Sequence, residues 1–199
     1  MVKADCGGCN GCSRCCHGMG NSIILDPYDV YRMTTGMGKS MQELLAASVE
    51  LNVVDGVILP NLKMQGTEEA CAYLDEEGRC SIHPYRPGIC RLFPLGRYYE
   101  NGGFSYFLQT GECAKENRSK IKVSKWIDTP DLTRNQQFTL QWHDLLHAME
   151  ERLTGEDEGK QQEENLLLLR LFYLLPYEGT TDFYSQFTER MEYWNEQIR

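Results

Sequence analysis

The chain has 199 residues, of which 41% are hydrophobic and 11% aromatic, and it carries a formal net charge of −9. This hydrophobic content is typical of a globular protein and excludes an intrinsically disordered one. The acidic balance disfavours nucleic acid as a partner, because phosphates bind basic surfaces. The nine cysteines are not needed to hold a very small fold together, since a chain of this length can bury a core of its own.

The N-terminus has no apolar stretch of the kind found in signal peptides. The longest apolar run, Leu166–Leu175, is interrupted by Arg170 and is shorter than the roughly 20 residues of a membrane-spanning helix. We therefore expect a cytoplasmic protein without a membrane partner, and we expect Leu166–Leu175 to be a buried helix face. In the reducing cytoplasm clustered cysteines indicate metal ligands or redox groups, and an odd number of them cannot all pair.

The first half of the chain predicts a loop followed by short elements. Residues 1–20 are rich in Gly and Cys and have no hydrophobic periodicity, so we expect a loop there. N-cap, capping-box and proline signals then mark two helices and an edge strand. These elements are a helix from Asp26-Pro27 to about Gly36–Gly38, a helix from Ser40 to about Val49, and a strand over Val57–Met64 broken by Pro60.

The rest of the chain predicts turns, one hairpin and three longer helices. Asp75-Glu76-Glu77-Gly78 is a turn, Pro87–Arg91 a helical turn, and Asn101-Gly102-Gly103 the turn of a hairpin between Tyr98-Tyr99 and Phe104–Leu108. The predicted helices run from Thr129-Pro130 to Gly155, over about Gln161–Leu175 and over about Thr181–Gln197. We expect a mainly α fold with a small β-hairpin, in which an irregular cysteine-rich metal-binding layer packs on helices. Since no cysteine follows Cys113, we divide the chain into a metal-binding domain, 1–120, and a helical region packed on it, 121–199.

The cysteines fall into two sets with the spacing of metal ligands. The N-terminal set is a chain of overlapping C-x2-C pairs, a spacing that lets one turn of backbone aim two sulfurs at one centre. Glycines between them allow the backbone to bend inward, so that amide N–H groups can bond to sulfur. The first set is Cys6, Cys9, Cys12, Cys15 and Cys16, and the second is Cys71, Cys80, Cys90 and Cys113. Together they allow one centre with spare thiols, or two sites.

The signature formed by these two sets resembles the CxxCxxCC family of zinc- or iron-chelating domains, also called YkgJ-type cysteine-cluster proteins, which include the flagellin lysine N-methylases. The resemblance covers roughly residues 9–113. It implies a metal centre, and it implies no reaction for most members. The residues that carry it are Cys9-x2-Cys12-x2-Cys15-Cys16, Cys71, Cys80-Ser81-Ile82-x2-Tyr85-x-Pro87-x2-Cys90-Arg91-x-Phe93-Pro94 and Cys113.

Two choices stay open among these cysteines. Iron–sulfur and zinc both accept four thiolates; we favour iron–sulfur, because Cys6, Cys9, Cys12 and Cys16 have the bacterial ferredoxin spacing, although His17 stands where that run has proline. Cys6 lies beyond the family pattern, and adjacent Cys15 and Cys16 can supply one ligand or two. The expected metal ligands are Cys9, Cys12, Cys15, Cys16, Cys71, Cys80, Cys90 and Cys113. We expect Cys12, Cys15, Cys80 and Cys90 to hold the cluster, with the others completing it or forming a second site.

Residues around the cysteines have alternative roles. Arg86 and Arg91 either neutralise thiolates or pair with nearby acids. Tyr85 and Phe93 are expected to cover the site. His83 is expected at the surface, and His17 either donates to sulfur or faces solvent.

His143 and His147 imitate one zinc-binding helix motif, H-E-x-x-H. Asp144 stands in place of the motif's glutamate, and no third ligand follows. We therefore expect a polar helix face there rather than a protease site.

Three functions are consistent with the sequence. The first is an iron–sulfur protein for electron transfer or in support of a protein-modifying reaction. The second is a zinc-binding structural module or metal chaperone. The third, implied by the resemblance alone, is an S-adenosylmethionine-dependent protein lysine methylase-like enzyme. A protein partner is possible in each case.

Overall fold

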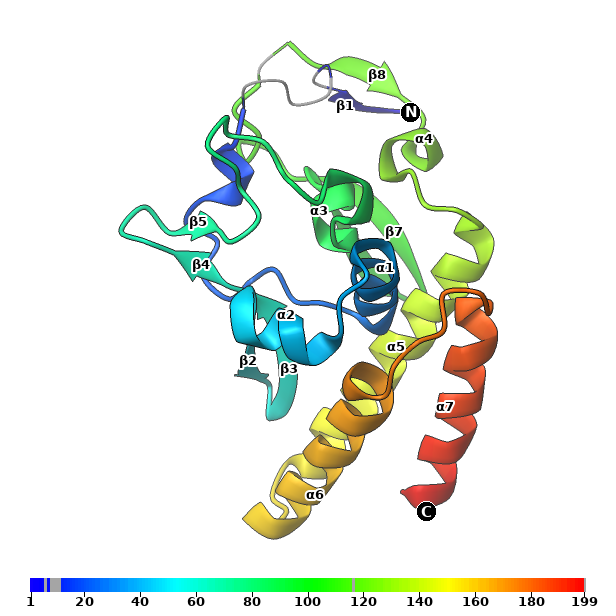
Figure 1. Ribbon diagram of the computed structural model, residues 1–199. Helices are drawn as coiled ribbons and strands as arrows, with labels where there is room; N and C mark the ends of the chain where they lie inside the picture. Colours follow the sequence, from blue (N-terminus) through cyan, green and yellow to red (C-terminus); the bar gives the residue numbers. More distant parts are fainter. Residues whose placement is uncertain (6, 8–11, 116, 199) are drawn as a thin grey trace.

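The computed structural model describes residues 1–5, 7, 12–115 and 117–198. Helices make up 46% of the chain and strands 20%, the strands forming small antiparallel hairpins, so the fold is mostly α with small β hairpins, as predicted. Long helices form one end of the molecule and short elements with loops form the other, where the N-terminus lies (Figure 1). Cys6 and Cys9, two of the cysteines in the predicted metal-binding pattern, lie outside the described residues.

The helices and strands have the following bounds. The helices are α1 Pro27–Met37, α2 Met41–Ala47, α3 Gly88–Leu92, α4 Val123–Ile127, α5 Leu132–Leu153, α6 Glu158–Leu169 and α7 Phe183–Gln197, with 3-10 turns η1 Arg14–Cys16 and η2 His83–Tyr85 and a π-helical turn η3 Arg170–Leu174. The paired strands are β1 Val2–Asp5 with β8 Ser119–Ile121, β2 Val49–Val54 with β3 Val57–Leu62, β4 Met64–Gln65 with β5 Ala70–Cys71, and β6 Leu95–Glu100 with β7 Gly103–Leu108.

Local sequence signals explain why α1 and α2 begin where they do. Asp26 accepts a hydrogen bond from the backbone of Asp29, and the Asp29 carboxylate accepts one from the backbone of Asp26. Ser40 and Glu43 form the same reciprocal capping box at α2. Gly38 ends α1 in the left-handed conformation, with φ of 63°. The predictions for both helices are confirmed.

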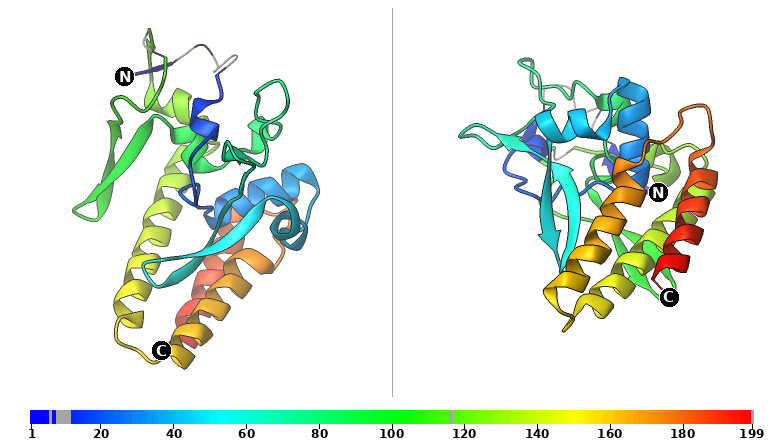
Figure 2. Two further views of the ribbon diagram at one scale, coloured as in Figure 1. Left: turned by 90° about the vertical axis from the view of Figure 1, so that its left-hand side faces the viewer. Right: turned by 60° about the horizontal axis from the view of Figure 1, so that its bottom comes forward.

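The hairpins follow from two-residue turns with positive φ. Asn101 and Gly102 have φ of 50° and 70° and join β6 to β7, as predicted. Asp55 and Gly56 join β2 to β3 in the same way. The sequence analysis missed β2, because its apolar residues directly follow α2. The β6–β7 hairpin projects from the rest of the molecule in the left view of Figure 2.

The hydrophobic core lies between the C-terminal helices and α1. Helices α5, α6 and α7 lie alongside one another (Figure 2), and one continuous cluster of buried residues runs from Ile23 to Trp194. Phe172 and Tyr173, within the predicted apolar stripe, are 0% and 1% exposed, which confirms that one face of this stripe is core, whereas Leu166 and Leu175 at its two ends are exposed. The core therefore includes residues on both sides of residue 120, and the division into two domains there stays a prediction.

Another difference from the prediction lies at the N-terminus. The first residues form β1, which pairs with β8, where Val2 faces Ile121 across the register. We predicted a loop, because a four-residue strand beside a Gly- and Cys-rich stretch has no periodicity to reveal it. The pairing places the start of the chain beside residues 119–121.

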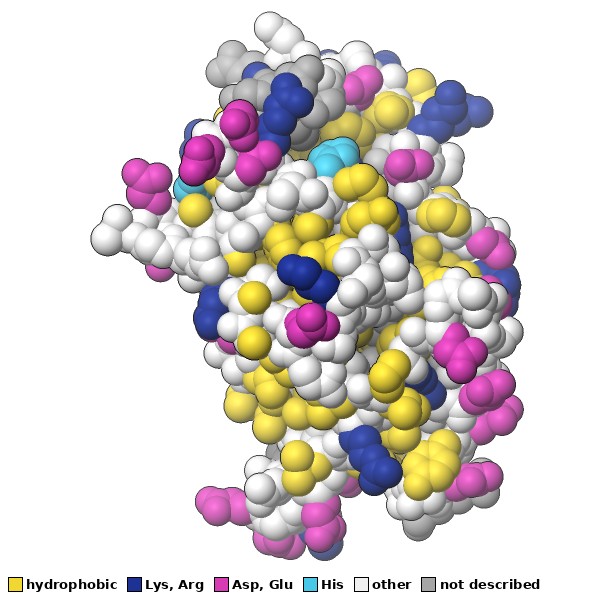
Figure 3. All heavy atoms as spheres, viewed as in Figure 1, with side chains coloured by type: hydrophobic (Ala, Val, Ile, Leu, Met, Phe, Trp, Pro, Cys, Tyr) yellow, Lys and Arg dark blue, Asp and Glu magenta, His cyan; other side chains and the backbone are white. Residues whose placement is uncertain are grey.

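None of the described helices is long and apolar enough to cross a membrane. On the face shown in Figure 3, Lys and Arg side chains are scattered and do not gather into one basic patch.

Candidate metal centre

Five of the described cysteines, from separate parts of the chain, line one cavity. The cavity has a volume of about 850 Å³. Its thiols come from η1, from β5, from the loop after the turn at Asp75, and from α3; they are Cys15, Cys16, Cys71, Cys80 and Cys90. The fold therefore brings together cysteines from both sets identified in the sequence.

The N-terminal cysteines are placed beside Cys71 by a short backbone pairing. Cys16 donates its backbone N–H to Ser13 at 2.8 Å, which closes the η1 turn. His17 forms an antiparallel bridge with Ala70, and Gly18 donates to Glu69 at 3.0 Å. Because Ala70 precedes Cys71 in β5, this pairing holds η1 next to that thiol.

Cys80 is placed by the turn that begins at Asp75. Gly78 donates to the Asp75 carbonyl at 3.0 Å, and the Asp75 carboxylate accepts from the Arg79 backbone at 2.7 Å. The turn returns the chain alongside Tyr73, whose carbonyl accepts from Ser81 at 2.8 Å. A Tyr73 hydroxyl contact with Ser48 at 2.6 Å then fixes this hairpin to the end of α2.

Cys90 is placed by a contact between α1 and α3. The Asp29 carboxylate, in the first turn of α1, accepts a hydrogen bond of 2.6 Å from the backbone of Gly88, the first residue of α3. Asp29 is 2% exposed. The capping box of one helix therefore also orients the helix that carries a cavity thiol.

The thiols shift one another's pKa values through hydrogen bonds and charge. A hydrogen bond from the Cys16 thiol lowers the pKa of Cys15 to about 6, and the charges of Arg86 and His17 act in the same direction. The same bond raises the pKa of Cys16. Burial raises the pKa of Cys90, and the charge of Asp29 raises it further.

Cys71 and Cys80 also have raised pKa values, chiefly because they are buried. Without a cation most of these groups therefore favour the protonated form. A bound cation favours thiolates instead, so metal binding releases protons.

The two arginines beside Cys90 have different surroundings. Arg86 lines the cavity, and its charge lowers the pKa of both Cys15 and Cys80. Arg91 is 4% exposed and lies by the buried carboxylate of Asp29. Burial raises the pKa of Asp29, and the positive charge of Arg91 lowers it. Thus Arg86 compensates thiolate charge, and Arg91 compensates a carboxylate.

The other residues that were predicted to surround the site also differ in their surroundings. Phe93 lines the cavity, as expected. Tyr85 packs against Gly36 of α1, where an added Cβ atom would overlap its ring. The His17 ring lines the cavity but contacts the Ser13 carbonyl, at 3.0 Å, and His83 is exposed, as predicted.

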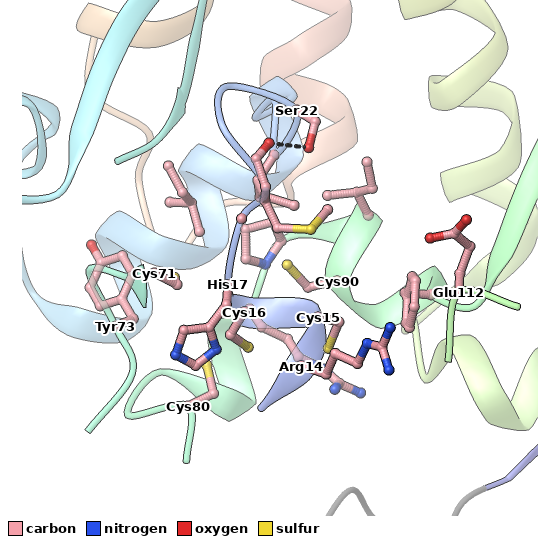
Figure 4. A pocket seen from close by; sticks show the side chains of 18 of the residues that line it. Arg14, Cys15, Cys16, His17, Ser22, Cys71, Tyr73, Cys80, Cys90 and Glu112 are labelled. Carbon is pink, nitrogen blue, oxygen red and sulfur yellow. Dashed lines mark hydrogen bonds between the residues drawn. The ribbon is translucent and has the colours of Figure 1, made fainter. Parts of the chain in front are cut away.

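A second, much smaller cavity lies beside the first. Its volume is about 30 Å³, and Cys12, Cys15 and Cys113 line it together with Glu112. Cys15 therefore borders both cavities. Figure 4 shows Cys16, Cys71 and Cys80 towards one side of the large cavity and Cys15, Arg14 and Glu112 towards the other, with Cys90 between.

The thiols share these cavities without already standing at bonding distance. Within the part of the chain that the structure describes, no three His, Cys, Asp or Glu side chains converge closely enough to hold a metal ion. Bonds to zinc need sulfur about 2.3 Å from the ion, so ligation requires the thiols to move closer together than they stand here. The described cysteines are all free thiols, which leaves them available for this.

His143 and His147 have neighbours other than a metal site. The His143 ring stacks on Tyr99 with centroids 3.8 Å apart, and its Nδ1 lies 3.4 Å from Asp144. His147 lies 3.6 Å from Glu151 on the next turn. Both histidines thus belong to a polar helix face, as predicted.

Asp29, Tyr73 and Glu112 contribute to the sites and were not predicted. The sequence identified the cap formed by Asp26, and the capping-box spacing alone could have indicated Asp29. Nothing in the sequence relates Asp29 to Gly88, because the contact spans 59 positions. Glu112 could have been noticed from its position next to Cys113.

Comparison with known proteins agrees with this geometry. No curated protein and no solved structure matches the chain. A family model, CxxCxxCC, described as "Putative zinc- or iron-chelating domain", matches residues 8–137. That range includes all of the described thiols that line the two cavities. The chain therefore belongs to the CxxCxxCC family of zinc- or iron-chelating domains.

Proposed function

We propose that the protein holds an iron–sulfur cluster in the large cavity, with Cys16, Cys71, Cys80 and Cys90 as ligands. The observation that supports this most is the presence of five thiols from distant parts of the chain around one cavity. Four of them satisfy the requirement of common clusters for four cysteine ligands. In this proposal the irregular cysteine-bearing segments form a layer over the helices that hold them in place.

The size of the cavity supports a cluster rather than a single zinc ion. The cavity has a volume of about 850 Å³, whereas one water needs only about 10–15 Å³ on the same measure. A structural zinc site is closed around its ion by four ligands. A cluster of several iron and sulfide atoms keeps thiolates further apart and fills more of this space.

The residues around the thiols suit a buried redox centre. Ile23, Leu62 and Ile82 are 5% or less exposed and line the cavity, so they limit the access of water. Arg86 supplies a positive charge near two thiols. Solvent exclusion and local charge are the features through which a protein sets the potential of a cluster. A cluster bound there would supply one-electron transfer, either as the activity itself or in support of a protein-modifying reaction.

The free thiols also suit a reducing compartment. All seven described cysteines are unpaired, and clustered thiols are kept reduced in the cytoplasm. This supports the cytoplasmic location that we expect.

The test is metal analysis of anaerobically purified and reconstituted protein. We expect bound iron and acid-labile sulfide in equal amounts, together with broad visible absorption. Cys71→Ser and Cys90→Ser should each abolish the visible spectrum. Cys113→Ser, which changes a thiol outside the large cavity, is the matched control and should retain it.

Two results would lead to the alternatives. Zinc as the sole bound metal after anaerobic reconstitution would reject the iron–sulfur proposal. Unfolding on zinc removal would then indicate a structural module, and ready loss of zinc from a folded protein would indicate a chaperone. Addition of S-adenosylmethionine to the loaded protein tests the methylase-like alternative, which requires a thermal shift on binding.

A further inference from the structure

A groove runs between α5 and α7, apart from the cysteine-lined cavities. It consists of two hollows with volumes of about 770 and 400 Å³. Gln141 of α5 and Thr188 of α7 line both hollows, so the two are consecutive parts of one groove. The lining residues lie between Arg134 and Ile198, and nearly all of them follow residue 137, where the match to the chelating-domain model ends. The chelating function of the family therefore does not account for this groove.

The groove has the length and the floor that suit a docked helix. The residues of α5 that line it run from Arg134 to Arg152, which span about 27 Å along the helix axis. Phe138 of α5 and Phe187 of α7 meet edge to face at its floor, with ring centroids 4.8 Å apart. Partly exposed apolar side chains also line it; they are Leu140, Met191 and Ile198. An amphipathic helix can lay its apolar face on such a groove.

The C-terminal helices carry most of the negative charge of the protein. Residues 129–199 contain 14 Asp and Glu but six Lys and Arg, so they carry −8 of the formal net charge of −9. A surface of one sign attracts partners of the opposite sign and repels those of the same sign. We therefore expect the occupant of the groove to be basic.

The charges that line the groove have the same sign. Two arginines line it, and each is already paired with a carboxylate of its own chain; the pairs are Arg134–Asp182 at 2.6 Å and Arg152–Glu164 at 3.0 Å. Glu189 and Glu192 of α7 also line the groove and are exposed. The ion pairs between described residues include neither of these two glutamates. The charges left for a partner are therefore negative.

We propose that this groove binds a basic amphipathic helix of a protein partner. The apolar face of that helix lies on the partly exposed apolar residues of the groove, and its Lys or Arg side chains lie beside Glu189 and Glu192. Charge complementarity selects this occupant, because a second copy of the chain would bring the same excess of negative charge to the surface. The bound helix becomes a fourth helix next to α5, α6 and α7, which lie alongside one another (Figure 2). The proposal goes beyond the metal centre and does not rest on it.

The test is the fluorescence anisotropy of three labelled peptides of about 18 residues, the number that spans the groove as a helix. The first peptide has Leu at helical spacing and Lys elsewhere. The second replaces every Lys with Glu, and the third is the first with a proline at its centre, which breaks the helix. With the protein as purified, we expect the Leu/Lys peptide to bind one to one, with an affinity that falls as salt is raised. The other two peptides should bind at least tenfold more weakly.

Two matched pairs of substitutions separate the groove from the general charge of the helices. Glu189→Gln/Glu192→Gln should weaken binding of the Leu/Lys peptide at least fivefold. Glu150→Gln/Glu163→Gln removes the same charge from exposed positions of α5 and α6 outside the groove. This control should leave the affinity within twofold of the wild type.

Thr188→Trp tests the space in the groove, because Thr188 is exposed and lines both hollows. An indole at this position should abolish peptide binding. Gln162→Trp is the matched control, since Gln162 is an exposed residue of α6 that does not line the groove, and it should bind the peptide as the wild type does. Both variants change exposed positions and should fold normally, which circular dichroism checks.

Failure of the wild type to bind the Leu/Lys peptide would overturn the proposal, as would equal weakening by the two glutamate pairs or full binding by Thr188→Trp. Self-association of the wild type without peptide, abolished in Thr188→Trp, would assign the groove to a second copy of the chain and would also overturn it. The outcome is separable from the fate of the iron–sulfur proposal, because none of the substituted residues lines a cysteine-lined cavity.

Discussion

Asp29 is the residue through which the fold most directly controls the proposed cluster site. Its carboxylate accepts a hydrogen bond of 2.6 Å from the Gly88 backbone and one of 3.3 Å from the Asp26 backbone. The positive charge of Arg91 lies beside it. Both carboxylate oxygens are therefore acceptors for N–H donors.

Asp29→Asn leaves one of those donors without an acceptor, because the new amide group is itself a donor. An orphaned buried donor costs about 1–3 kcal/mol. Asparagine also removes the negative charge near the buried guanidinium of Arg91, so we expect a loss at the upper end of this range, about 3 kcal/mol, in the free energy of unfolding. The Asn amide retains one acceptor, which keeps the loss from exceeding this range.

The assay is urea denaturation of the metal-loaded protein, followed by the rate of metal loss to a chelator. Because α3 carries Cys90, loosening its first turn should speed metal loss roughly tenfold, which corresponds to about 1.4 kcal/mol. Asp75→Asn is the matched control: Asp75 holds the exposed turn before Cys80, and asparagine forms the same kind of turn. An Asp29→Asn variant as stable as this control, or one that is destabilised without faster metal loss, would refute the reasoning.

Three further predictions concern the adjacent thiols, the β2–β3 hairpin and the histidine pair. In metal-free protein, the pH dependence of Cys15 alkylation, measured by mass spectrometry of the labelled protein, should follow a pKa of about 6. Cys16→Ala should move this pKa towards the ordinary thiol value of about 8.5. Cys16→Ser should leave the pKa unchanged, because serine still donates a hydrogen bond. Asn165 is 3% exposed and fixes α6 to the β2–β3 hairpin: it accepts a hydrogen bond of 2.6 Å from the Ile58 N–H and donates one of 3.2 Å to the Gly56 carbonyl. Asn165→Ala should therefore lower the free energy of unfolding by about 2–3 kcal/mol. A loss under about 0.5 kcal/mol would contradict the contact. His143→Ala/His147→Ala should leave the metal content measured by mass spectrometry unchanged, and a lost equivalent would show that the helix face binds metal.

The sequence predicted those elements whose boundaries depend on local chemistry. The starts of α1 and α2 follow from side chains that cap their own helix, and the β6–β7 turn follows from Asn101-Gly102. Such signals involve residues a few positions apart. They are therefore readable without knowledge of the fold.

Elements that depend on distant partners were missed or incomplete. Strand β1 exists through its pairing with β8, where Asp5 and Ser119 are 114 positions apart. The prediction that both sets of cysteines cooperate followed from their number and spacing. Which thiol faces which cavity depends on η1 and α3, whose positions are set by long-range contacts such as that of Asp29 with Gly88. Thus the residue types of the candidate site were predictable, and their division between two cavities was not.

The pairing of β1 with β8 also has a consequence for metal affinity. Val2 faces Ile121, and Ser119 donates to the Asp5 carboxylate at 3.1 Å, so the chain is anchored a few residues before Cys12. A ligand held on such a short tether meets its partners at a high effective concentration. If Cys12 is a ligand, as the sequence predicts, we expect the strand to raise metal affinity without supplying a ligand itself, and freeing it should accelerate metal exchange while every thiol stays in the chain.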